Sequence, residues 1–334
     1  MCIRDRGLYD GLALDGSNSN AALAAQLGSP IVLVLDSQGM TRGIAPLILG
    51  YQAFDPAIRI AGVILNKVGG SRHEAKLRAV IEHYTEVKVL GAVQRCDDLV
   101  INERHLGLVP SNELGSSQAH IKRMAGLIRE QVDIDVVQTL AATAQAPTGQ
   151  AAVPAAVVDF TDRVRIGVAS DSAFGFYYAG DLDALRAAGA ELVTFSPLQD
   201  KQLPVCDGLF LGGGFPETHM DGLEQNSAMR AAVASFIESD GPVYAECGGL
   251  MYLCSSLTWD GKTRKMVGVI PAKVAMHRKP QGRGYVRLRE TRAHPWPLSA
   301  DRPEPISAHE FHYSALDEVP EGLEFAYRVE RGYG

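Results

Sequence analysis

Short apolar runs rich in β-branched residues alternate along the chain with longer segments whose apolar residues recur at helical spacing. The runs "IVLVL", "IAGVIL" and "VKVLGAV" are typical of buried strands. This alternation indicates βαβ units around a parallel sheet, so the first half of the chain is predicted to be an α/β domain. The expected strands are 31–35, 60–65 and 87–93, and the expected helices are 43–54, 72–84 and 116–131.

The pattern changes at residues 141–158, "AATAQAPTGQAAVPAAVV", which contain no aromatic residue and are rich in Ala, Pro, Gln and Thr. This is the composition of an extended linker. A second α/β series follows, with expected strands at 164–169, 191–195, 208–214 and 242–246 and expected helices at 181–188 and 228–238. We therefore predict a first domain over 7–140, a linker over 141–162 and a second domain over 163–334.

The composition narrows the class of function. The chain has 334 residues, of which 46% are hydrophobic and 21% charged, as is ordinary for a globular protein of two domains. A net charge of -7 without a Lys/Arg run argues against nucleic acid or an anionic membrane surface as a partner. Five cysteines without CxxC spacing indicate neither a disulfide framework nor a zinc site, and they fit a reducing, cytoplasmic setting. Small molecules are the favoured ligands.

Both ends of the sequence are unusual. "MCIRDR" places three charged residues before "GLYDG" without periodicity, and "ERGYG" ends without a terminating element. The sequence reads as a fragment that lacks its true N-terminus, with a C-terminus that also reads as clipped.

The stretch "YAECGGLMYL" places Cys247 between an expected strand and a new apolar segment. Gly248 and Gly249 permit a sharp turn and a close backbone approach. A helix that starts here would place its N-terminus near the sulfur and favour the thiolate, which is the form that attacks carbonyl carbon. The N–H group of Gly248 is then a candidate oxyanion donor. A buried structural cysteine is the ordinary alternative, but the order strand, Cys, Gly, Gly, helix favours a nucleophile.

A nucleophilic cysteine needs a base, and the stretch "HEFHYS" supplies two candidates downstream, His309 and His312. A third stretch, "GLFLGGGFPE", ends an expected strand in three glycines. The N–H groups of Gly213 and Gly214 are candidates to complete an oxyanion hole, although glycine runs are also common in ordinary loops.

Together these three stretches resemble the class I glutamine amidotransferase domain, in the variant that closes cobyrinic acid a,c-diamide synthases and cobyric acid synthases. The resemblance implies a flavodoxin-like fold in which Cys247 attacks the side-chain amide of glutamine and releases ammonia. It implies that His312 raises the nucleophilicity of Cys247 and that His309 is a supporting or structural residue. Class I domains ordinarily have a Glu two residues after this His, where this chain has Ser314. The stretch "DSAFGFYYAGDLDALRAAGAEL" resembles the opening of this domain in the a,c-diamide synthases.

The stretches "GLYDG", "PIVLVLD", "AGVILNKVG" and "ERHLGLVP" resemble the ATP-dependent, P-loop-type synthetase half of the same family, which is related to dethiobiotin synthetase. The resemblance implies that ATP, with Mg²⁺, activates a substrate carboxylate as an acyl phosphate that ammonia attacks. It assigns Asp10 to substrate or metal handling and Asn66 to adenine, although turn formation explains both residues about as well. Asp36 closes a strand and is expected at the edge of the sheet where open α/β sheets bind ligands.

The P-loop sequence GxxxxGKS/T, which binds nucleotide phosphates, is absent from the 334 residues. The "GKT" at 261–263 lacks the required earlier glycine. Relatives carry this motif upstream of "GLYDG", so the resemblance implies that ATP use by this chain is incomplete.

The motifs predict a carbon–nitrogen ligase of cobalamin biosynthesis that amidates the a and c carboxylates of cobyrinic or hydrogenobyrinic acid with glutamine and ATP. Nickel-sirohydrochlorin a,c-diamide synthase is an alternative with the same architecture. A non-catalytic nucleotide-binding module and a cysteine hydrolase that uses the second domain alone are alternatives from other classes. The expected ligands are glutamine, ATP and a corrinoid tetrapyrrole, while the metal ligands and the oligomeric state, a homodimer included, stay open.

Overall fold

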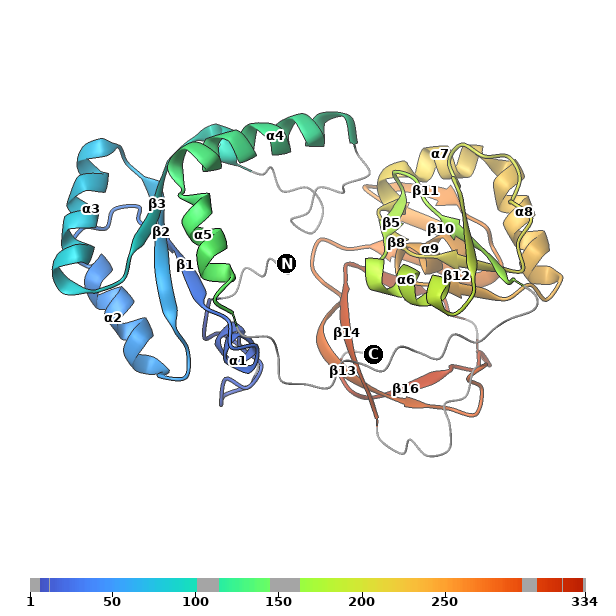
Figure 1. The fold of residues 1–334 in the computed structure, drawn as a ribbon. Coiled ribbons are helices and arrows are strands. Elements are labelled where there is room, and N and C mark those ends of the chain that lie inside the picture. The colour runs from blue at the N-terminus through green and yellow to red at the C-terminus, as the bar shows by residue number, and fades with distance from the viewer. Residues whose placement is uncertain are drawn as a thin grey trace. The chain divides into compact units, whose positions relative to one another are not determined.

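The chain forms two compact units (Figure 1). The computed structural model describes residues 7–11, 13–100, 114–144, 163–295, 305–319 and 321–332. Its described residues up to 144 belong to the first unit, and those from 163 belong to the second. The expected linker over 141–162 lies mostly outside the described residues, so its bounds stay a prediction. Its first residue, Ala141, is the last residue of a helix that the sequence did not predict, α5 (Ile134–Ala141).

The first unit contains a parallel sheet with the strand order β1-β2-β3. Its strands are β1 (Ile31–Asp36), β2 (Ile60–Val68) and β3 (Val89–Gln94), and the connecting helices are α2 (Ile44–Phe54) and α3 (Ser71–Tyr84). This is the βαβ arrangement predicted from the apolar runs. The other helical elements of the unit are α1 (Asn20–Gln26), η1 (Asp97–Leu99), α4 (Leu114–Gln131) and α5.

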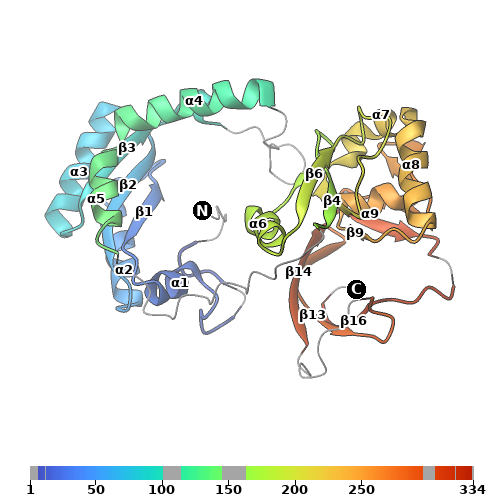
Figure 2. The same ribbon diagram turned by 45° about the vertical axis from the view of Figure 1, so that its right-hand side comes forward.

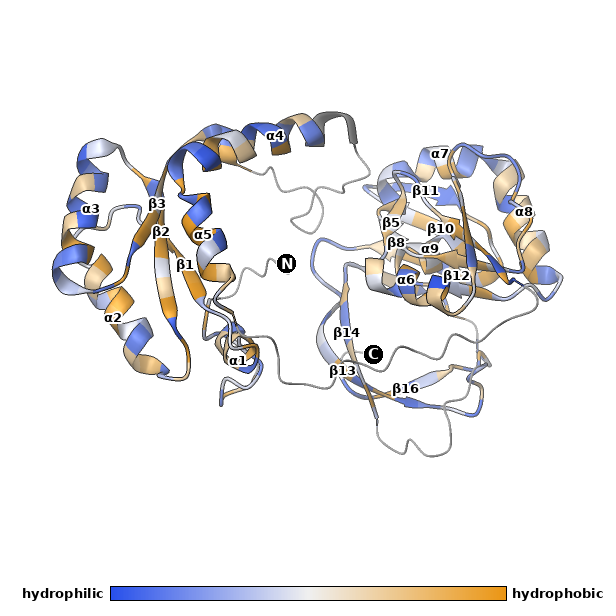
Figure 3. Cartoon of the chain, viewed as in Figure 1, coloured by the Kyte–Doolittle hydropathy of each residue, from blue (hydrophilic) through white to orange (hydrophobic). Residues whose placement is uncertain are grey.

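The core of the first unit lies between the sheet and helices α2 and α3. Ile48 of α2 and Leu77 of α3 are fully buried against Val63 and Leu65 of β2. Figure 3 shows β1 and β2 mostly in the hydrophobic colour, as expected for strands of a parallel sheet covered by helices. Parallel pairing of β1 with β2 places the carboxyl ends of both strands at the same edge of this sheet.

The second unit begins with a parallel sheet whose strand order is β6-β4-β7-β9. The strands are β4 (Arg165–Ala169), β6 (Glu191–Phe195), β7 (Gly208–Leu211) and β9 (Val243–Ala245). The first strand in the chain thus lies between the second and the third, which is the flavodoxin-like order predicted by the resemblance. In such sheets the loops that follow neighbouring strands meet at one edge, and here those are the loops after β7 and β9.

The expected strand 208–214 is divided in two. β7 ends at Leu211, the chain bends at Gly212, and β8 (Gly213–Gly214) pairs in antiparallel fashion with β5 (Phe174–Phe176). A continuous strand was therefore the wrong prediction. The bend arises because the N–H group of Gly212 donates to a side-chain hydroxyl, that of Tyr177, instead of to a neighbouring strand.

The C-terminal part of the second unit consists of strands that the sequence did not predict. One sheet has the order β11-β10-β12-β15 and another has the order β14-β13-β16. Their strands are β10 (Cys254–Trp259), β11 (Lys262–Lys265), β12 (Ile270–Met276), β13 (Gly282–Glu290), β14 (Ile306–His312), β15 (Ser314–Asp317) and β16 (Tyr327–Arg331). These strands are partly exposed and alternate polar with apolar residues, which is a weaker signal than a continuous apolar run. Figure 2 shows β13, β14 and β16 together, apart from the parallel sheet.

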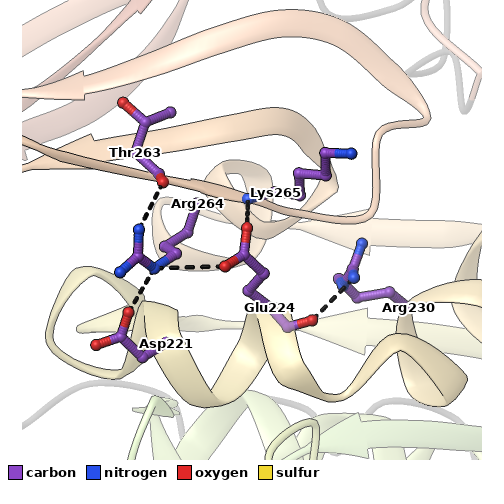
Figure 4. A network of polar contacts seen from close by, with 6 residues as sticks. All are labelled: Asp221, Glu224, Arg230, Thr263, Arg264 and Lys265. Atoms are coloured by element: carbon purple, nitrogen blue, oxygen red, sulfur yellow. Dashed lines mark hydrogen bonds and ion pairs between the residues drawn. The ribbon is translucent and has the colours of Figure 1, made fainter.

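A polar network attaches β11 to the helices beside the parallel sheet (Figure 4). The Nε atom of Arg264 lies 2.5 Å from Asp221 and 3.4 Å from Glu224, and the N–H group of Lys265 donates to Glu224 at 2.8 Å. Arg230 in turn donates to the backbone carbonyl of Glu224 at 2.9 Å. The helical elements of the unit are α6 (Ala179–Ala187), η3 (Pro216–His219), α7 (Met220–Gln225), α8 (Ser227–Glu238) and α9 (Gly248–Leu253). None of the helices in the described parts of the chain is long and apolar enough to cross a membrane.

Candidate active site

Cys247 lies at a sharp elbow between β9 and α9. Its φ of 45° and ψ of -104° place a non-glycine residue in the left-handed half of backbone space, which costs of order 1–3 kcal/mol and recurs where a nucleophile is presented. Hydrogen bonds hold the bend, because the N–H group of Glu246 donates to the carbonyl of Leu211 at 2.9 Å and that of Gly249 donates to Glu246 at 2.8 Å. A Cβ atom on Gly249 would lie 2.1 Å from the Leu211 oxygen. The elbow is therefore built by close backbone contact with β7.

The glycines predicted for an oxyanion hole gather around this elbow. A Cβ atom on Gly248 would lie 3.0 Å from the amide nitrogen of Gly214, and one on Gly213 would lie 3.7 Å from the Cβ atom of Cys247. A Cβ atom on Gly214 would lie 2.0 Å from the carbonyl oxygen of Ala173. Glycine at these positions lets the loop after β7 and the elbow after β9 approach each other. The structure thus brings together three of the residues that the sequence analysis singled out, along with Cys247.

Tyr177 holds the loop that carries these glycines. Its hydroxyl accepts the N–H group of Gly212 at 2.9 Å and donates to the carbonyl of Ala169 at 2.5 Å, so it joins the ends of β7 and β4. Burial raises the pKa of Tyr177 to about 12, so this hydroxyl keeps its proton at neutral pH. Tyr177 belongs to the stretch "DSAFGFYYAGDLDALRAAGAEL", whose resemblance to the family does not predict this structural role.

The resting sulfur of Cys247 is a thiol. Although Cys247 is exposed as a residue, protein atoms surround its sulfur, and this burial raises the pKa of the thiol above the usual value. The N–H group of Gly248 lowers the pKa, whereas the negative charges of Glu217 and Glu246 raise it further. α9 has six residues, and the effect of its N-terminus on the thiolate is opposed by burial and by the two carboxylates.

Glu217 is a buried acid beside the nucleophile that the sequence analysis did not single out. It belongs to η3, directly after the glycine loop, and is 3% exposed. Burial raises the pKa of its carboxyl group to about 7, with a small opposing effect from its own N–H group. Only its position after "GGGFP" could have drawn attention to it, since a Glu after a Pro is ordinarily exposed.

His312 ends β14. Its Nδ1 atom lies 2.8 Å from the carbonyl oxygen of Ser314, and its Nε2 atom lies 3.6 Å from the carboxylate of Glu310. No hydrogen bond joins Cys247 to His312 within the described residues. Such contacts are often long before substrate binds, so the assignment of His312 as the base stays a prediction. His309 occupies the other face of β14, where its ring packs at 5.6 Å against that of Tyr285.

In the first unit, Asp36 and Asn66 are neighbours across the carboxyl ends of β1 and β2. Lys67, with a φ of 56°, places its ammonium group 2.6 Å from the Asp36 carboxylate. This ion pair, with the N–H group of Gln38, lowers the pKa of Asp36. The edge of the sheet thus carries an acid, an amide and an ammonium group, as expected for a polar ligand site.

Asp10 lies elsewhere in the first unit. It lines a pocket of about 600 Å³ together with Tyr9, Asp15 and residues at the C-terminal end of α2, namely Phe54 and Asp55. That end of α2 leads into the start of β2, so the structure does not bring Asp10 to the edge occupied by Asp36 and Asn66.

The part of the chain that the structure describes contains no metal site formed by its own side chains. Within the described ranges there is no cluster of three or more His, Cys, Asp or Glu side chains that could hold a metal ion. The Asp36 carboxylate is already paired with Lys67. The GxxxxGKS/T sequence that binds nucleotide phosphates is also absent from the 334 residues.

A parallel sheet in flavodoxin-like order with a cysteine elbow and a glycine loop defines the second unit as a glutamine amidotransferase domain. Residues 165–333 match the CobB/CobQ-like glutamine amidotransferase domain, and residues 11–103 match an AAA domain. Both the α/β fold class and its two-part organisation into a P-loop-type and an amidotransferase domain are therefore confirmed.

The similar proteins described below share one name, cobyrinate a,c-diamide synthase. The cobyrinate a,c-diamide synthase of Magnetococcus marinus is 44% identical over 98% of this chain and 70% of its own length. Those of Archaeoglobus fulgidus and Methanosarcina acetivorans are 40% and 38% identical, each over 98% of this chain and 70% of their own length. The chain belongs to the cobyrinate a,c-diamide synthase family.

Proposed function

We propose that the second unit hydrolyses glutamine at Cys247 and supplies the ammonia for amidation of the a and c carboxylates of cobyrinic or hydrogenobyrinic acid. The observation that supports this proposal most directly is the strained elbow, which presents Cys247 beside the backbone of Gly213, Gly214 and Gly248. A structural cysteine would not need a backbone conformation that costs free energy.

In the proposed reaction, the Nε2 atom of His312 takes the proton of the Cys247 thiol as the sulfur attacks the carboxamide carbon of glutamine. Backbone N–H groups of the glycine loop and the elbow donate hydrogen bonds to the developing oxyanion. The proton then passes from His312 to the leaving nitrogen, and ammonia departs. Water hydrolyses the remaining thioester to glutamate and restores the thiol, so the cysteine is regenerated in each cycle.

The decisive experiment measures glutamate released from glutamine by the full chain. Cys247→Ser is expected to abolish release, because a serine hydroxyl is a far weaker nucleophile in this site. Cys96→Ser, which changes a free cysteine of the first unit, is the matched control and is expected to leave release unchanged. Release that survives Cys247→Ser would contradict the proposal.

For the first unit we propose that Asp36 and Asn66 belong to an adenine nucleotide site and that Asp10 belongs to the site of the carboxylate substrate. The position of Asp36 and Asn66 at the carboxyl edge of the sheet supports the nucleotide assignment. Because the phosphate-binding sequence is absent from these residues, this chain is expected to hydrolyse glutamine without forming diamide from ATP and cobyrinic acid. Diamide produced by the chain alone would contradict this expectation, and the same assay with nickel-sirohydrochlorin tests the ring that is accepted.

A further inference from the structure

The register of β13 and β14 places two ionisable side chains next to each other on one face of their sheet. Gly282 pairs with His312 and Gly284 pairs with Glu310, and side chains that face each other across a ladder share a face. The remaining pairs on this face are apolar: Val286 with Ala308 and Leu288 with Ile306. His312 and Glu310 therefore lie next to each other, at positions i and i+2, with only glycine across from each.

The ring of His312 has a defined tautomer. Its Nδ1 atom is 2.8 Å from the carbonyl oxygen of Ser314, and a carbonyl only accepts, so Nδ1 carries the hydrogen. In the neutral ring the Nε2 atom then carries the lone pair and is the atom that takes a proton. That atom lies 3.6 Å from the Oε2 atom of Glu310.

Glycine at 282 makes this arrangement possible. A Cβ atom there would lie 2.2 Å from the Nε2 atom of His312 and 2.8 Å from the Oε2 atom of Glu310. The Glu310 side chain is 17% exposed and that of His312 is 37% exposed, so their attraction is only partly screened by water.

Glu290 shares this face but lies at the far end of β13, and His277 donates its backbone N–H group to the carbonyl of Tyr313, the residue after His312. Arg283 and Arg287 of β13, like His309 of β14, occupy positions on the opposite face of the sheet. Asp317 of β15 is exposed, three residues beyond the Ser314 carbonyl. The carboxylate of Glu310 lies within ion-pair distance of the His312 ring, at 3.6 Å.

We propose that Glu310 is a positioning residue for glutamine hydrolysis, whose carboxylate stabilises the imidazolium that His312 becomes on taking the Cys247 proton. This inference rests on the proposed role of His312. Class I domains ordinarily place a Glu two residues after the histidine. Here Ser314 occupies that position and orients the ring of His312 through its backbone carbonyl, while Glu310, two residues before His312, supplies the negative charge. Glu310 itself takes no proton, since the proton passes from the sulfur to Nε2 and then to the leaving ammonia.

The test is the pH dependence of kcat/KM for glutamine hydrolysis. The acid side of this profile reports protonation of the base, because Cys247 is a thiol in the resting state. Glu310→Gln is expected to move the acid half-maximal pH down by about half a unit to one unit, since the protonated ring loses its counter-charge. The plateau is expected to fall about three- to tenfold because a weaker base accepts the thiol proton less readily. Asp317→Asn removes the same charge from the neighbouring β15 and is expected to leave the profile unchanged.

A Glu310→Gln profile that coincides with that of the unaltered chain would overturn the inference, as would a uniform loss of rate without any shift in pH. If Glu310→Gln does not fold, as judged by circular dichroism, Glu310→Asp carries the test. It retains the charge and is expected to keep the acid side in place, and a shift as large as half a unit would overturn the inference. Release of glutamate that does not depend on Cys247 would instead overturn the proposed function and this inference together.

Discussion

The buried carboxyl group of Glu217 is expected to make the second unit less stable as the pH rises towards about 7. Its carboxyl group is 3% exposed and lies beside the elbow, and burial raises its pKa from 4.5 to about 7. The unfolded chain releases this proton near pH 4.5, whereas the folded chain keeps it until about pH 7. The unfolded state therefore binds fewer protons between these values, and the free energy of unfolding falls as the pH rises through this window. Above about pH 7 the contribution of Glu217 levels off.

The size of the effect follows from the shift. At about 1.4 kcal/mol per pKa unit, a rise from 4.5 to about 7 is worth up to about 3 kcal/mol of unfolding free energy. Glu217→Gln keeps the shape of the side chain and removes the ionisation. The variant is expected to lose this pH dependence and to be more stable than the unaltered chain by about 1–3 kcal/mol at pH 8.

Urea unfolding, followed by tryptophan fluorescence to which Trp259 in β10 of the same unit contributes, measures this difference from about pH 5 to about pH 8. Glu238→Gln, at the exposed end of α8, makes the same chemical change without burial and is expected to alter stability by at most about half a kcal/mol. If Glu217→Gln retains the pH dependence of the unaltered chain, the buried carboxyl is not the cause and the reasoning fails.

The same variant tests the electrostatics of the nucleophile. The charge of Glu217 contributes to the raised pKa of Cys247, so its removal is expected to increase the thiolate fraction. At about pH 8, iodoacetamide should alkylate Cys247 about threefold faster in Glu217→Gln than in the unaltered chain, as followed by peptide mass spectrometry. Equal alkylation rates would show that the two groups are not coupled.

Two further substitutions test the packing around the elbow. Gly249→Ala is expected to lower the free energy of unfolding by about 2–4 kcal/mol, because its Cβ atom would lie 2.1 Å from the backbone oxygen of Leu211. Gly180→Ala in α6 is the control, and it should be neutral or stabilising because its Cβ atom would meet nothing within 4 Å. Urea unfolding measures both variants. Tyr177→Phe is expected to cost about 1–3 kcal/mol in the same measurement and to slow glutamine hydrolysis, because it leaves a backbone N–H group without its acceptor. Tyr178→Phe, at a neighbour that is 81% exposed, is the control, and an equal loss in both variants would contradict this explanation.

The apolar runs by themselves determined the parallel strands and the helices between them. The observed β1, β6 and α2 begin and end within one residue of the predicted bounds, because short β-branched runs and helical spacing of apolar residues leave distinct patterns in the sequence. The elbow was also predictable, since strand, Cys, Gly, Gly is a local pattern in which each residue type has a steric reason. The grouping of Gly213 and Gly214 with Cys247 was implied by the family resemblance and not by a local pattern.

Only the tertiary structure decided the electrostatics of the site. The pKa values of Cys247 and Glu217 depend on how much protein surrounds them, and the loop after β7 and the elbow after β9 meet through strand order rather than through sequence distance. The partner of His312 likewise depends on the register between β13 and β14, because a shift of one residue would turn Glu310 to the opposite face. Burial and register depend on contacts between segments far apart in the chain, so a local sequence pattern does not predict them.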